Sequence, residues 1–202
     1  MHSKSTWKEI LRHKLPGEKA HLRMAPSFRG DPTSMEDAVQ AAVLVLFYPS
    51  DGKTHLVFIK RNEYDGPHSA QVSFPGGARE TGDNTMEETA LRETREEIGV
   101  SGPIEILGSL SPLHIPVSNF MVYPFVGWME ETPVFRPDPT EVRYVIEVSL
   151  KELLDPANRD SETRYHHAQP IEAPFYRIGK EKIWGATAMM LSEVLLLATT
   201  LQ

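Results

Sequence analysis

The sequence contains no cysteine among its 202 residues. This absence excludes disulfide bonds, a thiol nucleophile and thiolate metal ligands. A metal ion bound by this chain would therefore need oxygen or imidazole ligands.

An excess of positive charge is also missing. The 28 acidic residues outnumber the 21 lysines and arginines and give a net charge of −7. Proteins that bind nucleic acids or membrane surfaces non-specifically normally carry a basic excess. We therefore expect neither of these partners, and a phosphorylated ligand would need a cation to offset its repulsion by an acidic surface.

Long apolar runs are scarce. The most apolar segment, residues 188–201, is interrupted by Ser192 and Glu193 and is shorter than the roughly 20 residues that a membrane-spanning helix needs. The first 15 residues spread their charges along the chain and lack the apolar core of a signal peptide. These features predict a cytoplasmic protein without an export signal.

Segments typical of strands alternate with segments typical of helices. Apolar runs at 42–48 and 55–61 flank a Pro-Ser-Asp-Gly turn and predict two paired strands. Further strands are predicted at 71–74, 104–110, 121–128 and 143–150, a hairpin at 175–185, and helices at 5–15, 149–155 and 186–201. This alternation predicts an α/β fold built in layers. We divide the chain into an N-terminal helix and lead-in, residues 1–36, and one main domain, residues 37–202.

A fourth helix is predicted for residues 86–98. Thr85 and Glu88 form a capping-box pattern before it, and Gly99 is a natural terminator after it. At about 100° per residue, three glutamates of this helix fall on one face, opposite the apolar one. They are Glu93, Glu96 and Glu97.

The shared face of these glutamates has two interpretations. It can be a solvated surface, supported by opposite-charge pairs of Arg92 with Glu88 and Glu96. It can also be a metal site, because like charges at these spacings repel unless a cation lies among them. Carboxylate oxygens suit Mg²⁺ or Mn²⁺. We favour the metal site, because Gly76 and Gly77 precede the helix closely enough for the backbone to approach whatever the carboxylates hold.

The segment "GGARETGDNTMEETALRETREEIGV", residues 76–100, resembles the Nudix box, usually written G-x5-E-x7-R-E-U-x-E-E-x-G-U with U apolar. Its tail, 92–100, fits almost completely, although Thr94 stands where an aliphatic residue is usual. Its first part, before Arg92, is one residue longer than the pattern. With Gly77 as the first glycine, Asp83 stands where the pattern has its first glutamate. The resemblance implies a Nudix fold, an α/β/α sandwich with a mixed β-sheet, and hydrolysis of a nucleoside diphosphate linked to another group.

The segment "LVFIKRNEYDGPHSAQVSFPGG", residues 56–77, resembles a motif of Nudix hydrolases of the coenzyme A pyrophosphatase type. Arg61, His68 and Gln71 match it, as does the run 74–77, whereas Gly66 and Ala70 replace an arginine and a glycine. The resemblance implies metal-dependent cleavage of coenzyme A or a derivative into phosphopantetheine and adenosine 3′,5′-bisphosphate. The alternatives are a pyrophosphatase for ADP-ribose, NADH or dinucleotides and, less favoured, a non-catalytic nucleotide-binding module.

The resemblance also suggests roles for the charged residues. We expect Glu93 and Glu97 to ligate Mg²⁺ or Mn²⁺, and Glu96 to bind the metal through water or to act as general base. Arg92 would orient Glu93 through charge-assisted hydrogen bonds. Glu141, in a later loop, can supply a further carboxylate that binds metal or activates water, or it can be merely solvated.

Substrate contacts are expected from residues upstream of the acidic helix. The guanidinium of Arg61 suits phosphate recognition, although the residue can also simply cap a strand edge. His68 can contact substrate or serve as scaffold, and Gly76 and Gly77 would bring the backbone to the substrate. The expected partner is a small nucleotide-type molecule, and a homodimer is compatible with the sequence.

Overall fold

Two apolar strands form the centre of the computed structural model, which describes residues 3–29, 35–65, 68–166 and 168–200. β1 (Val39–Ser50) and β2 (Lys53–Arg61) are antiparallel neighbours. The turn between them places Asp51 and Gly52 at positive φ, as tight hairpin turns require. The prediction of two paired strands is confirmed.

The main sheet has eight strands. The remaining six are β3 (Val72–Ser73), β4 (Gly76–Ala78), β5 (Glu105–Ser109), β6 (Leu113–Ile115), β7 (Phe120–Trp128) and β8 (Val142–Ser149). Its path runs β3-β2-β1-β7-β5, with β4 on β1, β6 on β7 and β8 on β2. β1 is parallel to β7 and antiparallel to β2 and β4. The sheet is therefore mixed, as the resemblance to the Nudix family implied.

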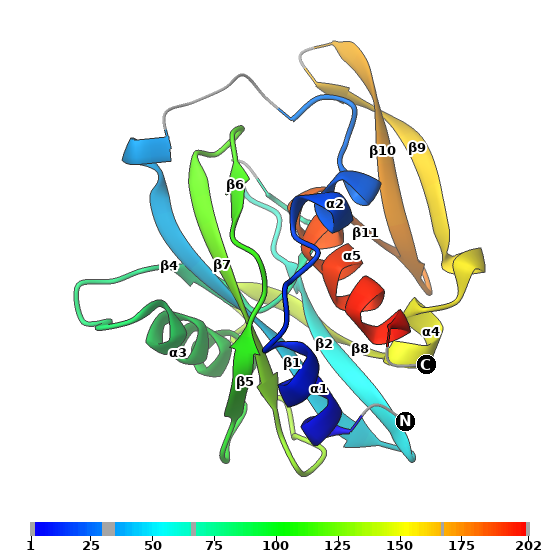
Figure 1. Cartoon of the computed structure of the whole chain (residues 1–202). Coiled ribbons are helices and arrows are strands. Elements are labelled where there is room, and N and C mark those ends of the chain that lie inside the picture. The colour runs from blue at the N-terminus through cyan, green and yellow to red at the C-terminus, as the bar shows by residue number, and fades with distance from the viewer. Residues whose placement is uncertain (1–2, 30–34, 66–67, 167, 201–202) are drawn as a thin grey trace.

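Alternate residues of β1 supply two separate cores, because successive side chains of a strand point to opposite faces of the sheet. Leu44 and Leu46 pack with α3 (Met86–Ile98) on one face. Val45 and Phe47 pack with α1 (Lys4–Ile10) and α5 (Gly185–Thr199) on the other. Figure 1 shows these helices on the two sides of the sheet. The predicted layers of helix, sheet and helix are confirmed.

The N-terminal segment belongs to the second of these cores. Trp7 of α1 is fully buried and stacks on Phe47, with 4.6 Å between ring centroids. The helix ends at Ile10 rather than at residue 15 as predicted. Pro16 disfavours helical geometry only at Leu15, and residues 11–12 form a turn in place of a further turn of helix.

A second sheet of three antiparallel strands packs beyond α5 (Figure 1). β9 (Arg159–His166), β10 (Gln169–Ile178) and β11 (Glu181–Trp184) form it. The β10–β11 hairpin confirms the prediction for residues 175–185. β9 was not predicted, because its sequence RDSETRYH has no apolar alternation to mark a strand. α5 lies between the two sheets and is buried on nearly all sides, which explains its almost uninterrupted apolar sequence.

Short helical turns complete the fold. They are α2 (Glu18–His21), α4 (Leu150–Leu153) and the 3₁₀ turns η1 (Leu22–Met24), η2 (Met35–Asp37) and η3 (Pro156–Asn158). The capping of α4 by Ser149, whose hydroxyl accepts the Glu152 N–H, was predicted. Within the described residues, no helix has the length and apolarity needed to cross a membrane.

Candidate active site

α3 carries the acidic side chains of the candidate site, and its bounds are those predicted from the sequence. The Thr85 hydroxyl caps the first turn by accepting the backbone N–H of Glu88 at 3.1 Å. Gly99 ends the helix in the left-handed conformation, with φ of 59°. α3 packs on β1 and β4, and this contact brings its glutamates to the glycines of β4.

The two glycines that open β4 lie directly against the glutamates. The backbone N–H of Gly76 donates to Oε2 of Glu97 at 2.7 Å. A Cβ atom on Gly77 would lie 2.5 Å from Oε2 of Glu93, closer than real Cβ contacts occur. Glycine is therefore required at position 77 for the observed placement of Glu93.

Glu97 is the most buried carboxylate of α3, with only 1% of its surface exposed. Besides the Gly76 N–H, its partner is Arg61, whose Nη1 lies 3.3 Å from Oε1. Burial raises the pKa of Glu97 to about 8, although these two partners act in the opposite direction. A buried carboxylate with so few partners is costly for the fold, and a bound cation would offset that cost.

Glu93 and Glu141 add negative charge beside Glu97. Burial raises the pKa of Glu93, against the opposing effect of Arg92. The charge of Glu141 raises the pKa of both Glu93 and Glu97. The carboxylate of Glu141 therefore lies near enough to interact electrostatically with both glutamates, and its expected role stays a prediction.

The donor set fits a hard divalent cation. Mg²⁺ usually keeps several waters and binds through one or two carboxylates plus the oxygens of a phosphate. Glu93 and Glu97, side by side under the glycine turn, can supply two such carboxylates. In the part of the chain that the structure describes, no group of three or more acidic or histidine side chains forms a preassembled metal cage.

Arg92 organises this acidic surface and leaves little of its guanidinium for a ligand. Its Nη1 donates to Glu93 and Glu96 at 2.9 Å each. Its Nε and Nη2 donate to the two carboxylate oxygens of Asp83 at 3.0 and 2.9 Å, and Nη2 also donates to the Ala78 carbonyl. Two parallel hydrogen bonds between a guanidinium and a carboxylate fix the relative orientation of Arg92 and Asp83 as well as pairing their charges.

Asp83, the acid at the head of the box, is a partner of Arg92. Its carboxylate also accepts the hydroxyl of Thr89 and the backbone N–H of Glu80. These bonds, led by the Arg92 guanidinium, hold the pKa of Asp83 well below its usual range. The turn that contains the additional residue is closed by Arg79, which donates to the Asp83 carbonyl.

Glu96 lies at the solvent edge of the site. Its side chain is 59% exposed and pairs with Arg92. Its predicted role, as an indirect metal ligand or general base, stays a prediction.

His68 and its neighbours form one wall of the site. The ring Nε2 lies 2.9 Å from the hydroxyl of Ser118 and Nδ1 lies 3.4 Å from Oε1 of Gln71. Burial lowers the pKa of His68, and the charge of Arg61 adds to this effect. These effects outweigh the opposing effect of Gln71 and favour the neutral imidazole, which acts as a hydrogen-bonding group.

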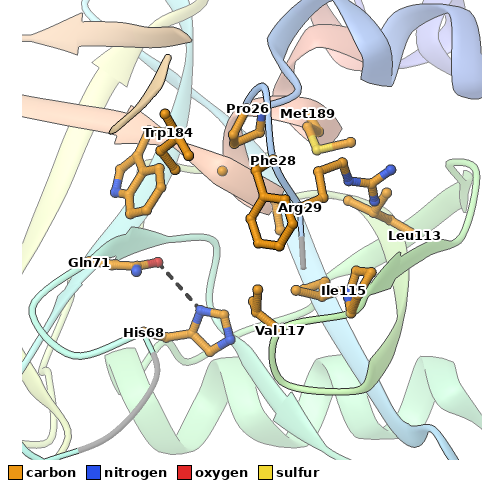
Figure 2. A pocket seen from close by; sticks show the side chains of 14 residues that line it. Pro26, Phe28, Arg29, His68, Gln71, Leu113, Ile115, Val117, Trp184 and Met189 are labelled. Carbon is orange, nitrogen blue, oxygen red and sulfur yellow. Dashed lines mark hydrogen bonds between the residues drawn. The ribbon is translucent and has the colours of Figure 1, made fainter. Parts of the chain in front are cut away.

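Two adjoining cavities meet at this wall. The first, which we call the site pocket, has a volume of about 390 Å³ and is lined by Arg61, Gly76 and Gly77 among others. The second, the side pocket, has a volume of about 300 Å³ and is shown in Figure 2. His68, Gln71, Ile115 and Ala186 line both. The structure thus places Arg61, His68, Gly76 and Gly77, all predicted to contact substrate, around one cavity.

Several residues of these cavities were not predicted. Phe28 and Arg29, from the segment interpreted as a polar lead-in, line the side pocket together with Trp184. Tyr64 and Asp65 line the site pocket. Tyr64 and Asp65 lie within the motif at 56–77 but match no position named in it, whereas Phe28, Arg29 and Trp184 meet only through the packing of distant segments.

Comparison with known proteins identifies the family. Residues 38–169 match the NUDIX domain family. The chain is 32% identical over 189 residues to the human mitochondrial coenzyme A diphosphatase NUDT8, covering 89% of this chain and 72% of that protein. It is also 32% identical over 181 residues to an uncharacterized Nudix hydrolase, NudL, of Pectobacterium atrosepticum, covering 87% and 88% of the two chains.

A solved structure shares the fold. The crystal structure of a MutT/nudix family protein from Enterococcus faecalis aligns with a TM-score of 0.53 at 18% identity, covering 96% of this chain and 73% of that one. Because the family match alone spans more than half of the sequence, the protein belongs to the Nudix hydrolases, enzymes that act on diphosphate bonds and generally use divalent metal ions.

Proposed function

We propose that the protein hydrolyses the diphosphate of coenzyme A or its derivatives, giving phosphopantetheine and adenosine 3′,5′-bisphosphate. The observation that carries this proposal is the position of the upstream residues Arg61, His68 and Gln71. They line the same pocket as the glycines that contact Glu93 and Glu97. The human relative named as a coenzyme A diphosphatase supports the choice of substrate.

The backbone at Ala70 also supports this choice. Ala70 stands where the coenzyme A motif has glycine, and it adopts the left-handed conformation, with φ of 54°, that glycine favours. Its N–H donates to the Asn62 carbonyl at 3.1 Å. The turn between Arg61 and Gln71 therefore keeps a glycine-like backbone in spite of the substitution. Gly66, the other departure, lies outside the described residues.

Mg²⁺ or Mn²⁺ would be held by Glu93 and Glu97, with Glu96 acting through water. When bound, the metal would neutralise phosphate oxygens and lower the pKa of a water molecule. The protein groups hold the site in position. Arg92 fixes the carboxylate of Glu93, and the Gly76 N–H fixes that of Glu97.

Arg61 and the acids around it would divide the remaining tasks. Arg61 brings a permanent positive charge to the pocket and can bind a phosphate oxygen of the substrate. The proton released by the attacking water needs an acceptor, and Glu96 and Glu141 are the two candidate carboxylates. Glu141 is positioned through its backbone, since its carbonyl accepts the Asn62 N–H at 3.1 Å.

Product analysis by mass spectrometry tests the proposal. Pure protein would be incubated with Mg²⁺ or Mn²⁺ and, separately, with coenzyme A, ADP-ribose, NADH and a diadenosine polyphosphate. We expect phosphopantetheine from coenzyme A at the highest kcat/KM of the panel. Cleavage of another substrate with coenzyme A untouched would overturn the assignment. Tight binding without any product would instead indicate a nucleotide-binding module.

A further inference from the structure

The side pocket has no part in the chemistry described above, yet it adjoins the site pocket. His68, Gln71, Ile115 and Ala186 line both cavities. A substrate whose diphosphate lies beside Arg61 and the glycines would extend past His68 if one of its two groups occupied the side pocket. Only one of the two groups attached to a diphosphate can occupy the side pocket.

The walls of the side pocket are mainly apolar. Aliphatic side chains come from the loop around β6, from β10 and from α5, and aromatic rings come from the N-terminal segment and β11. Figure 2 shows them around the cavity: Leu113, Ile115, Val117, Met189, Phe28 and Trp184. Cavities of this kind bind a ligand by apolar contact and orient it with a few polar groups.

Three polar side chains interrupt the apolar lining. His68 and Gln71 stand at the wall shared with the site pocket. Arg29 adds a cation, and its Nη2 is held by the His114 carbonyl at 2.8 Å. Among the residues that the structure describes, no acidic side chain lines this pocket, so it lacks the carboxylates that commonly accept ribose hydroxyls.

The site pocket offers the groups that suit a nucleoside. Tyr64, with 45% of its surface exposed, and the carboxylate of Asp65 line it. Aromatic rings stack on bases, and a carboxylate can hydrogen-bond ribose hydroxyls. Both cavities have a mainly apolar lining, and the difference between them is that the site pocket also carries the carboxylate of Asp65.

We propose that the side pocket is the binding site for the pantetheine arm, a branched aliphatic chain with two amides, and that adenosine lies on the Tyr64 and Asp65 side. This inference rests on the proposed function. The dimethyl group and methylenes of the arm would contact Val117, Ile115 and Met189. Arg29 and Gln71 would hydrogen-bond its amides. These residues would then select among diphosphates by the group attached to the second phosphate.

Inhibition by the two expected products separates the halves of the substrate. Coenzyme A hydrolysis would be measured with added phosphopantetheine or adenosine 3′,5′-bisphosphate, for the wild type, Val117→Asp and Val134→Asp. Val117 is 50% exposed and lines only the side pocket, so its replacement should not disturb the core. Val134 is 71% exposed, lines neither cavity and serves as the matched control.

We expect Val117→Asp to raise the inhibition constant of phosphopantetheine at least tenfold, because a desolvated carboxylate opposes binding of an apolar chain. The constant for adenosine 3′,5′-bisphosphate should change less than about twofold, and Val134→Asp should change neither beyond this range. Phe28→Ser is a second variant at a 40% exposed position of the pocket and should act in the same direction. Thermal melting would confirm that each variant is folded.

The outcomes separate this inference from the function on which it rests. If the wild type leaves coenzyme A intact, the proposed function fails and the inference fails with it. If coenzyme A is cleaved but Val117→Asp and Phe28→Ser leave both constants unchanged, the inference alone is wrong. The inference is also wrong if these variants weaken the binding of adenosine 3′,5′-bisphosphate instead, since the side pocket would then hold the nucleoside.

Discussion

At the residue scale, the site is built on one buried carboxylate. Glu97 is nearly inaccessible and receives one backbone N–H and one guanidinium contact. Most buried carboxylates in proteins have hydrogen-bond partners for both oxygens. Because Glu97 has few partners and lies next to Glu93, we interpret it as a functional residue rather than a stabilising one.

Replacing Glu97 should separate activity from stability. We expect Glu97→Gln to lower kcat at least about 100-fold. Loss of a residue that only supports a metal ligand typically lowers activity by about 10- to 100-fold, and loss of a ligand itself should have a larger effect. The fold without metal should be as stable as the wild type or more so, because the amide has no charge to desolvate. Hydrolysis assays and thermal melts in chelator would measure both effects. Glu87→Gln, on the exposed first turn of α3, is the control, and full activity of Glu97→Gln would remove Glu97 from the metal site.

The glycine at position 77 leads to a second prediction at this scale. A methyl group there would displace the carboxylate of Glu93, which lies 2.5 Å from the position of a Cβ atom. We expect Gly77→Ala to lower kcat/KM by about 10- to 100-fold, since a displacement of about 1 Å at a reactive group can have that effect.

Gly82→Ala is the matched control for Gly77→Ala. A Cβ atom at Gly82 meets nothing within 4 Å, and the residue lies in the turn before the same helix. Its activity should stay within about twofold of wild type, as for most surface substitutions. Equal activities of the two variants would show that the close approach of Gly77 to Glu93 has no role in catalysis.

At the scale of elements, the turn before α3 is fastened to the helix by Asp83 and Arg92. The head of the box has one residue more than the family pattern, and the turn accommodates it while the ion pair keeps both of its N–H···O contacts. Because Arg92 also contacts Glu93 and Glu96, the turn and the acidic face of the helix form one unit.

This ion pair predicts a pH dependence of stability. The pKa of Asp83 is lowered in the folded state, so its contribution is fully present above the pKa of an unfolded aspartate, about 4. It is lost as the pH falls below that value towards the lower folded-state pKa. We expect Asp83→Asn to melt at a lower temperature than wild type at pH 7, with a difference that shrinks below pH 4. A difference that is constant from pH 7 to pH 3 would show that the charge of Asp83 is not responsible.

At the scale of the whole molecule, the N-terminal segment and the C-terminal helix meet in one core. The carboxylate of Glu193 on α5 is fully buried and accepts hydrogen bonds from the backbone of Gly17 and from the backbone and hydroxyl of Ser111. The ring of His21 lies 3.2 Å from the same carboxylate. This network joins α5 to the N-terminal segment and to the loop after β5.

Replacement of Trp7 tests how much the N-terminal segment contributes to the free energy of unfolding. Trp7→Ala would remove a fully buried ring that stacks on Phe47, and such substitutions typically lower the free energy of unfolding by about 3 to 5 kcal/mol. Denaturant titration of the full chain would measure the change, with Lys14→Ala, at an exposed position, as control. The sequence-based division of the chain at residues 36 and 37 stays a prediction. An unchanged denaturation midpoint would mean that residues 1–36 form a part that can be separated from the main domain.

Local patterns were sufficient for the elements that carry strong periodicity or clear capping. α3 was predicted to the residue because Thr85, Glu88 and Gly99 act within one or two turns of the chain. The hairpin of β1 and β2 was predicted from two apolar runs around a turn. β9 was missed, because a polar strand gains its hydrogen bonds from β10 and not from its own sequence pattern.

The same distinction applies to the site. The spacing of Glu93, Glu96 and Glu97 and the glycine pair before them indicated a metal site, because these residues lie in one continuous segment. The resemblance of that segment to the Nudix box implied diphosphate hydrolysis. Burial and cavities depend instead on segments far apart in the chain. Only packing decided that Glu97 would be desolvated while Glu96 stays exposed, and only packing brought Phe28, Arg29 and Trp184 to one pocket.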